Sequence, residues 1–459
     1  MIEKILNFAS AYDMFPAGSG VVLVCVSGGA DSMSLLEALM QISDELGFEI
    51  AVAHFNHCLR GAESDRDESF VKDYCADCGV AAYSSRGDVK GHAKNNGLSI
   101  EEAARELRYK FFYDLSDEIG ACKIAMAHTA DDNTETILIN LTRGAGAGGL
   151  SGIPPVRGNI IRPMLSVTRD EVMQFLEDRG ISFVEDSTNA QDIHVRNKIR
   201  HHVIPVLKEL NPRLHESARN ASALLRDDES ALNGLADLFI DEHCEGLTAD
   251  VHALLTAPVS VSSRVIRKLH GGKLTSAQVK SVLNLCAAEK PSAKISLPKV
   301  TVYRNYDTIS FESNDQHGHG GYLGELASEG FEEVFPADGE SIIIFGTGLK
   351  ISCSYRVFDD EMANFNKSLT SFVFKSIDIY GKITVRPRHE GDKLSIYGRG
   401  HTKSLKKLFI EKRIPARKRA LVPVIADSSG VLGVYGVGRS GRAVPRPGDM
   451  AVFIIFEEA

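Results

Sequence analysis

Val21-Val-Leu-Val-Cys-Val-Ser-Gly-Gly-Ala-Asp-Ser32 is the stretch that decides the fold of the first half of the chain. Its first six residues are all apolar, which is typical of a β-strand buried on both faces. The next six, Ser27-Gly28-Gly29-Ala30-Asp31-Ser32, place two glycines, which permit a sharp turn, before a predicted helix. Backbone N–H groups at a helix start attract an anion. The stretch therefore predicts a phosphate-binding loop; a plain Gly-Gly turn capped by Asp31 or Ser32 is the alternative.

Strand-like and helix-like segments alternate along the first 215 residues. Two pairs, Ser99 with Glu102 and Thr168 with Glu171, have the spacing of capping boxes that begin helices. The alternation predicts an α/β fold with a doubly wound parallel sheet, where ligands bind at the carboxyl ends of the strands. The predicted strands are 21–26, 49–57 and 123–128, and the predicted helices are 63–78, 100–117, 132–141 and a segment that ends at Arg179.

A chain of 459 residues is longer than one domain usually is, so we predict three domains. The N-terminal α/β domain covers residues 1–215. A helix-rich middle domain covers 216–330 and includes a hairpin at Val300–Phe311. A small α+β domain covers 340–459, with strands at 341–345 and 350–355, and the polar run 314–321 is a predicted linker.

Basic residues are concentrated in one segment, although the net charge of the whole chain is −9. Residues 381–420 contain 13 Lys and Arg against three Asp and Glu, a net charge of +10, which leaves −19 for the other 419 residues. This segregation predicts contact with a polyanion, and a solvated basic surface is the alternative.

Cysteine usage and hydropathy place the chain in a reducing compartment. The eight cysteines are scattered and do not resemble a secreted disulfide framework. No apolar run approaches 18 residues, and the first ten residues do not resemble a signal peptide. We therefore expect a cytoplasmic protein without a membrane span.

Carboxylates follow two of the predicted strands. Asp31 lies in the loop, and Asp131, Asp132 and Glu135 follow the strand 123–128 at a helix start. A carboxylate beside a phosphate-binding loop is expected to bind a Mg²⁺ ion that lies between it and the phosphates. Asp31 is therefore the predicted metal ligand. The other three either hold Mg²⁺, accept a proton, or complement the helix dipole; we favour a functional role.

Several segments resemble one enzyme family. Ser27–Ser32 resembles the pyrophosphate loop of the PP-loop ATP pyrophosphatases, whose domain is adenine nucleotide α-hydrolase-like. The basic segment, including Arg386-Pro387-Arg388 and Lys406-Lys407-Leu408-Phe409, is similar to the last domain of the tRNA(Ile)-lysidine synthetases, whereas 215–330 matches only in length and helical character. The segments that narrow the resemblance to these synthetases are His54–Gly61 (HFNHCLRG), Ala104–Tyr109 (ARELRY), His128–Thr136 (HTADDNTET) and Arg196–Arg200 (RNKIR).

The resemblance implies a reaction and its substrates. ATP would adenylate the first anticodon cytidine of an isoleucine tRNA with a CAU anticodon, and free L-lysine would then replace AMP at C2. The loop Ser27–Ser32 would hold the pyrophosphate with Mg²⁺, and Lys403, Lys406 and Lys407 would contact tRNA. Asp132 and Glu135 look like lysine-binding acids, with Asp132 as the first candidate for the base that takes a proton from lysine.

Two arginine pairs are candidates for anion contacts. Arg105 and Arg108 share a helix face with Tyr109, an arrangement that suits a phosphate or carboxylate, or else a salt-bridged surface. Arg196 and Arg200 are four residues apart and would contact the RNA backbone or the leaving pyrophosphate, with a solvated helix as the alternative.

Three histidines lie at the ends of predicted strands, His54 and His57 in 49–57 and His128 in 123–128. We expect His54 and His128 near the adenine, with ordinary packing as an alternative. Together with His57 they would make a zinc trio, but the spacing suits no familiar site and no fourth ligand is evident.

Two other functions remain open. One is a tRNA thiolase of the same superfamily, which Cys75-Ala76-Asp77-Cys78 favours, although these cysteines lie in a predicted helix away from the loop. The other is a non-catalytic nucleotide- or RNA-binding protein, which would have no use for the carboxylates. The sequence leaves the oligomeric state open, with a homodimer as one option.

Overall fold

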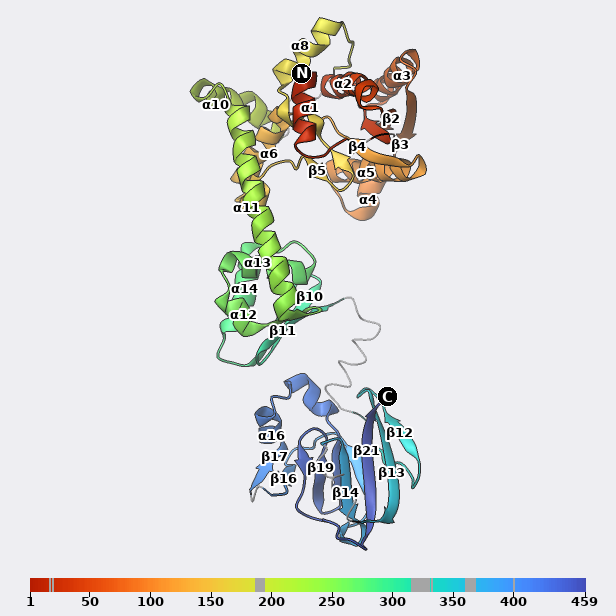
Figure 1. The fold of residues 1–459 in the computed structure, drawn as a ribbon, viewed down its shortest axis with the longest axis vertical. Helices are drawn as coiled ribbons and strands as arrows, with labels where there is room; N and C mark the ends of the chain where they lie inside the picture. The colour runs from red at the N-terminus through yellow and green to blue at the C-terminus, as the bar shows by residue number, and fades with distance from the viewer. Residues whose placement is uncertain are drawn as a thin grey trace. The chain divides into compact units, whose positions relative to one another are not determined.

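The chain forms two compact units. The computed structural model describes residues 1–15, 18, 20–185, 195–314, 331, 333–359, 369–398 and 401–459. The units are Met1–Ala231 and Leu232–Ala459 (Figure 1). The predicted division into three domains stays a prediction, and the predicted linker lies, apart from Asn314, outside the described residues. Among the described helices, none is long and apolar enough to cross a membrane.

The first unit is built on a six-stranded sheet in the order β3-β2-β1-β4-β6-β5. All neighbouring pairs are parallel except β5 with β6. Chain order reverses direction beside β1, with β2 on one side and β4 on the other, so the ligand-binding switch point lies between β1 and β4. The strands are β1 (Val21–Cys25), β2 (Glu49–Asn56), β3 (Ala81–Arg86), β4 (Ala121–Ala125), β5 (Val156–Arg157) and β6 (Ile160–Ile161).

Helices cover both faces of this sheet, which confirms the predicted doubly wound α/β fold (Figure 1). One face packs Val22 and Val24 against α1, α2 and α8. The other packs Leu23 against Phe112 and Leu115 of α5. The alternation of neighbours along β1 explains why its sequence is apolar at every position.

Two helices of the first unit, α5 and α8, begin where the sequence predicts, whereas α6 begins at Ala130, two residues before its predicted start. Both predicted capping boxes are present, Ser99 with Glu102 and Thr168 with Glu171. The helices are α1 (Ile2–Ser10), α2 (Ala30–Leu46), α3 (Ala62–Asp77), α4 (Val89–Asn96), α5 (Ile100–Glu118), α6 (Ala130–Thr142), α7 (Ala147–Leu150), a 3-10 turn (Pro163–Ser166), α8 (Arg169–Arg179), α9 (Val195–Lys198), a π-helical turn (Ile199–Val203), α10 (Ile204–Leu210) and α11 (Leu214–His243), which continues into the second unit.

One predicted strand is displaced. We predicted a strand at 123–128, whereas β4 spans Ala121–Ala125. Met126 still donates its N–H to Ile161 O at 2.9 Å, but the chain then turns, because Thr129 is the N-cap of α6. The polar residues after β4 therefore lie at the carboxyl edge of the sheet.

The second unit begins with helices packed on an antiparallel sheet. The predicted hairpin is confirmed, since β10 (Val300–Asn305) pairs with β11 (Thr308–Ser313). Three strands that we did not predict complete the order β7-β8-β11-β10-β9. The remaining elements of this part are β7 (Cys244–Glu245), β8 (Thr248–Asp250), α12 (Val251–Thr256), α13 (Val259–His270), α14 (Ser276–Ala287) and β9 (Ser292–Leu297).

The C-terminal part of the second unit is β-rich, as predicted. Its two four-stranded sheets have the orders β12-β13-β21-β14 and β15-β18-β19-β20, and β16 pairs with β17. The elements are β12 (Ser341–Ile344), β13 (Leu349–Val357), β14 (Ser371–Lys375), a 3-10 turn (Ser376–Asp378), β15 (Thr384–Arg386), β16 (Lys393–Ser395), β17 (Thr402–Ser404), α16 (Leu405–Glu411), a 3-10 turn (Ala416–Leu421), β18 (Val424–Asp427), β19 (Gly430–Val434), β20 (Gly438–Arg439) and β21 (Met450–Glu458).

Candidate active site

The loop Ser27–Ser32 joins β1 to α2 in the conformation that an anion site requires. Gly28 has φ +90°, a value that side chains other than glycine rarely adopt. Gly29 is the N-cap of α2, and no side chain caps this end. The serine hydroxyls hold the loop together: Ser27 N donates to Ser32 Oγ at 3.1 Å, and Ser32 Oγ donates to Gly29 O at 2.9 Å. The first amides of α2 therefore face the edge of the sheet without a capping side chain.

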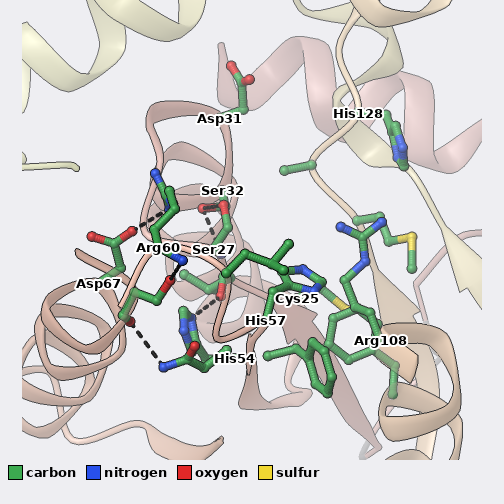
Figure 2. Close-up of a pocket in the computed structure, with 18 residues that line it drawn as sticks. Cys25, Ser27, Asp31, Ser32, His54, His57, Arg60, Asp67, Arg108 and His128 are labelled. Carbon is green, nitrogen blue, oxygen red and sulfur yellow. Dashed lines mark hydrogen bonds and ion pairs between the residues drawn. The ribbon is translucent and has the colours of Figure 1, made fainter. Parts of the chain in front are cut away.

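A cavity of about 550 Å³ opens at this loop. Residues from β1, β2, the loop after β4, and α5 line it, so it lies at the switch point of the sheet (Figure 2). Its walls are partly apolar, with Phe55, Leu59, Phe112 and Met126. An apolar wall beside an anion site suits a nucleotide, which joins a flat base to charged phosphates.

Asp31 stands at the cavity with one oxygen engaged and one free. Its Oδ2 accepts from Arg169 Nη1 at 3.0 Å, whereas its buried Oδ1 has no hydrogen-bond partner among the described residues. Burial raises the pKa of Asp31 to about 6, against the opposing effect of Arg169. A buried carboxylate oxygen without a partner, beside an anion site, fits a divalent cation that the phosphates would also ligate.

The three histidines have different environments. His54 Nδ1 lies 2.9 Å from Val26 O, so this side chain ties β2 to the end of β1. The Nδ1 atoms of His57 and His128 are buried without partners, and burial is the main cause that lowers the pKa of each to about 4. All three line the cavity as neutral rings. Among the described residues, no group of three His, Cys, Asp or Glu is arranged to hold a metal ion, so the zinc alternative gains no support.

The structure separates the two arginines of α5. Arg108 lines the cavity, where burial lowers the pKa of its guanidinium. Arg105 is exposed, donates to Tyr109 Oη at 3.2 Å and lies over the Tyr109 ring at 4.6 Å. Only Arg108 is therefore placed to contact a ligand in this cavity.

The two carboxylate oxygens of Asp132 have different contacts. Thr129 donates its backbone N–H to Asp132 Oδ2 at 2.9 Å, which completes a capping box at the start of α6. Asp132 Oδ1 lies 3.8 Å from Arg196 Nη2 and 3.7 Å from Arg200 Nη2. The start of α6 is linked to the cavity through Arg169, which donates its backbone N–H to Asp131 and its guanidinium N–H to Asp31.

Glu135 is the buried centre of a charge cluster. Its side chain is 1% exposed, and it accepts from Arg196 Nε at 2.7 Å and from Arg200 Nε at 2.5 Å. Arg200 lies in the π-helical turn Ile199–Val203, a feature that often marks functional sites. The structure thus brings Asp132, Glu135, Arg196 and Arg200 together, an association that the sequence analysis did not predict, and it places both oxygens of Glu135 against guanidinium groups.

Sequence reasoning missed three polar groups at this edge. Arg169 binds Asp31, and nothing in its position after a helix cap pointed to the loop. Arg60 donates to Asp67 Oδ2 at 2.8 Å, and both line the cavity. His215 contacts Asp131 across 84 positions of sequence, its Nε2 atom 3.1 Å from Oδ1. Of these three groups, only Arg60 lies in a segment that the sequence analysis singled out, His54–Gly61.

The predicted tRNA-binding lysines lie in the second unit. Lys403 is on β17 and forms an ion pair with Glu411 at 2.7 Å. Lys406 and Lys407 lie on α16 with exposed side chains. Their exposure suits contact with a phosphate backbone.

The cysteines give the thiolase alternative no support. Cys75 is buried in α3 and Cys78 follows the helix, and burial raises the pKa of both thiols. Cys25 lines the cavity, but burial raises the pKa of its thiol strongly. A reactive cysteine needs a lowered pKa.

Comparisons with known proteins agree with this geometry. Residues 3–207 match the PP-loop domain family, and residues 383–449 match the TilS substrate C-terminal domain family. The tRNA(Ile)-lysidine synthase of Geobacillus kaustophilus is 32% identical over 476 aligned residues, which cover 100% of this chain and 99% of the relative. The enzyme of that name from Geobacter sulfurreducens is 32% identical, with 99% and 96% covered.

Solved structures are more distant. A U34-tRNA thiolase from Methanococcus maripaludis is 17% identical with a TM-score of 0.42, and the similarity covers 49% of this chain and 77% of that one. The sequence relatives, which are similar along their whole length, decide the assignment. This chain belongs to the tRNA(Ile)-lysidine synthase family.

Proposed function

We propose that the protein uses ATP to attach free L-lysine to C2 of the first anticodon cytidine of a tRNA(Ile) with a CAU anticodon. AMP and pyrophosphate are the other products. The observation that carries the proposal is the uncapped start of α2, whose loop lies at one cavity with Asp31 and Arg108. Membership of the family agrees with the reaction.

In the first step the cytosine O2 attacks the α-phosphate of ATP. Pyrophosphate leaves toward the amides of Ser27–Ser32 and the N-terminus of α2, which stabilise its charge. Asp31, whose Oδ1 is free, would hold Mg²⁺, which when bound would supply positive charge to offset the negative charge of the leaving group. His54 and His128 would border the adenine, and Arg108 would contact a phosphate or the base.

In the second step the ε-amine of lysine attacks C2 and AMP departs. An amine with a pKa of about 10.4 is neutral only about once in 2,500 molecules at pH 7, so a base is needed. Asp132 is the proposed base, because its Oδ1 faces the cluster while Oδ2 is held by the helix cap. Glu135 fixes the two arginines, and direct contact between Glu135 and lysine stays a prediction.

Holding the tRNA is the proposed task of the basic segment 381–420. Lys403, Lys406 and Lys407 would bind its phosphates, with the salt dependence that phosphate contacts produce. The base itself must leave its stack to reach the cavity. The division at residues near 215 and 340, and a homodimeric state, remain proposals.

The test is transfer of labelled lysine to a tRNA(Ile) transcript with a CAU anticodon. Label should enter the tRNA only with ATP, and AMP should form in equal amount. The matched control is the same transcript with uridine at the first anticodon position, which should accept no label. Formation of AMP without lysine transfer, or sulfur transfer instead, would reject the proposal.

A further inference from the structure

Asp131 is a partly buried residue that joins three helices. It lies in the first turn of α6, next to Asp132, and its side chain is 17% exposed. Its Oδ2 accepts the backbone N–H of Arg169, the first residue of α8, at 2.9 Å. Its Oδ1 lies 3.1 Å from Nε2 of His215, the second residue of α11. Each carboxylate oxygen therefore fixes the end of a different helix.

Both ring nitrogens of His215 lie close to side chains of α6 at this junction. Its side chain is 6% exposed, and its other ring nitrogen, Nδ1, lies 2.8 Å from Thr134 Oγ1, also on α6. Burial raises the pKa of Asp131, but the contact with His215 and the amide of Arg169 outweigh it, and the net pKa is lowered. Asp131 is therefore ionised at neutral pH, with the Nε2 atom of the His215 ring 3.1 Å from its Oδ1.

The junction continues to the cavity through Arg169. The backbone of Arg169 binds Asp131, and its guanidinium donates to Asp31 Oδ2 at 3.0 Å. The Arg169 side chain is 40% exposed, so it has room to adopt another rotamer. Without His215, Asp131 Oδ1 would lose this side-chain contact, while Asp131 Oδ2 stays bound to the backbone of the residue whose guanidinium holds Asp31.

We propose that His215 is a positioning residue: by engaging Asp131, it leaves the Arg169 guanidinium to orient Asp31 in the cavity. The inference rests on the proposed function only for the role of Asp31. A partly buried carboxylate that loses its partner recovers much of the lost free energy by pairing with a nearby cation. Arg169 would turn from Asp31 to Asp131, and Asp31 would lose its orientation.

The test is single-turnover pyrophosphate release with saturating ATP and tRNA, measured on the full chain. His215→Leu should slow release about tenfold at saturating tRNA, and a titration of tRNA should give a half-saturating concentration within about twofold of wild type, because the change acts on the chemical step. Adding Asp131→Asn to His215→Leu removes the competing charge and should restore release to within about threefold of wild type. A purely structural role of His215 would make the double variant worse than the single one.

Two further variants distinguish a loss of activity from a loss of stability. Asp131→Asn alone is isosteric and should stay within about threefold of wild type, because no charge then competes for Arg169. Ser222→Ala is the matched control: Ser222 is a fully buried residue of α11 that accepts from Asn133 of α6 at 3.3 Å, with no link to Asp31. It should lower the melting temperature without slowing release.

The outcomes separate the two proposals. Unchanged release by His215→Leu, a double variant no faster than the single variant, or a severe loss in Asp131→Asn would overturn the inference. A wild-type protein that releases no pyrophosphate with tRNA and lysine would instead reject the proposed function.

Discussion

Charged side chains near the cavity of the first unit differ in pairing and exposure from two lysines of the basic segment 381–420. Near the cavity two carboxylates have fixed partners: Glu135 is 1% exposed between two arginines, and Asp31 is held by Arg169. In the basic segment Lys406 and Lys407 are exposed on α16. Groups that meet reacting atoms must be positioned in advance, whereas groups that hold a polyanion need only a long side chain and a charge.

Replacing Asp31 should produce the largest effect. Asp31→Asn keeps the shape of the side chain but removes the charge opposite the phosphates, so pyrophosphate release should fall by roughly 10²–10³. Asp170→Asn is the matched control, because Asp170 is 90% exposed on the neighbouring helix. A loss of less than about threefold in the Asp31 variant would show that the reaction does not depend on a positioned charge at the cavity.

The pH dependence should follow from the same carboxyl group. The pKa of Asp31 is raised from 3.8 to about 6, so the active ionised form is lost as the pH falls through 6, and the rate should drop about tenfold per pH unit below it. The stability effect has the opposite sign. The folded state binds this proton more tightly, so ionisation destabilises the fold as the pH rises from about 4 to 6.

A stability profile checks that sign. Asp31→Asn should unfold at a higher temperature than wild type at pH 7, and the difference should vanish near pH 4. Equal melting temperatures at both pH values would contradict the raised pKa.

Glu135→Gln should break the most buried ion pair of the cluster. We expect the free energy of unfolding to fall by about 2 kcal/mol, less than for a fully buried pair because the arginines are 41% and 29% exposed. For a unit of this size the melting temperature should fall by about 4–8 °C. Glu177→Gln, on an exposed position of α8, is the control and should change it little.

The smallest effect is expected from the lysines. Lys406→Ala and Lys407→Ala should each weaken tRNA binding a few-fold and reduce the slope of log affinity against log salt by about one. Lys403→Ala should have a smaller effect on the slope, because Glu411 already neutralises that charge. Equal slopes for all three variants would show that pairing does not matter in this segment.

Local patterns predicted the framework of the first unit because its signals lie within a few residues of each other. Ser99 and Glu102 cap α5 as their spacing indicates, and the apolar run at Val21 is β1. The capping box between Thr129 and Asp132 was missed, although it has the same local form with Asp in place of Glu. The strands β7, β8 and β9 were missed because they are short or border a sheet whose partners lie far along the chain.

The site was predicted as a set of residues but not as a set of contacts. Asp132, Glu135, Arg196 and Arg200 do come together, yet the sequence could not show that Glu135 is buried between the arginines, because the pairs span more than 60 positions. Arg105 was predicted together with Arg108, but of the two only Arg108 lines the cavity, and Arg105 is exposed. Contacts of this range depend on the packed fold.

The cap at the start of α6 couples the positions of the two carboxylate oxygens of Asp132. Since one oxygen closes the first helical turn, the other cannot shift unless that turn frays. Hydrogen exchange of the Thr129 amide would therefore measure, in the resting protein, how often the opposite oxygen leaves its place.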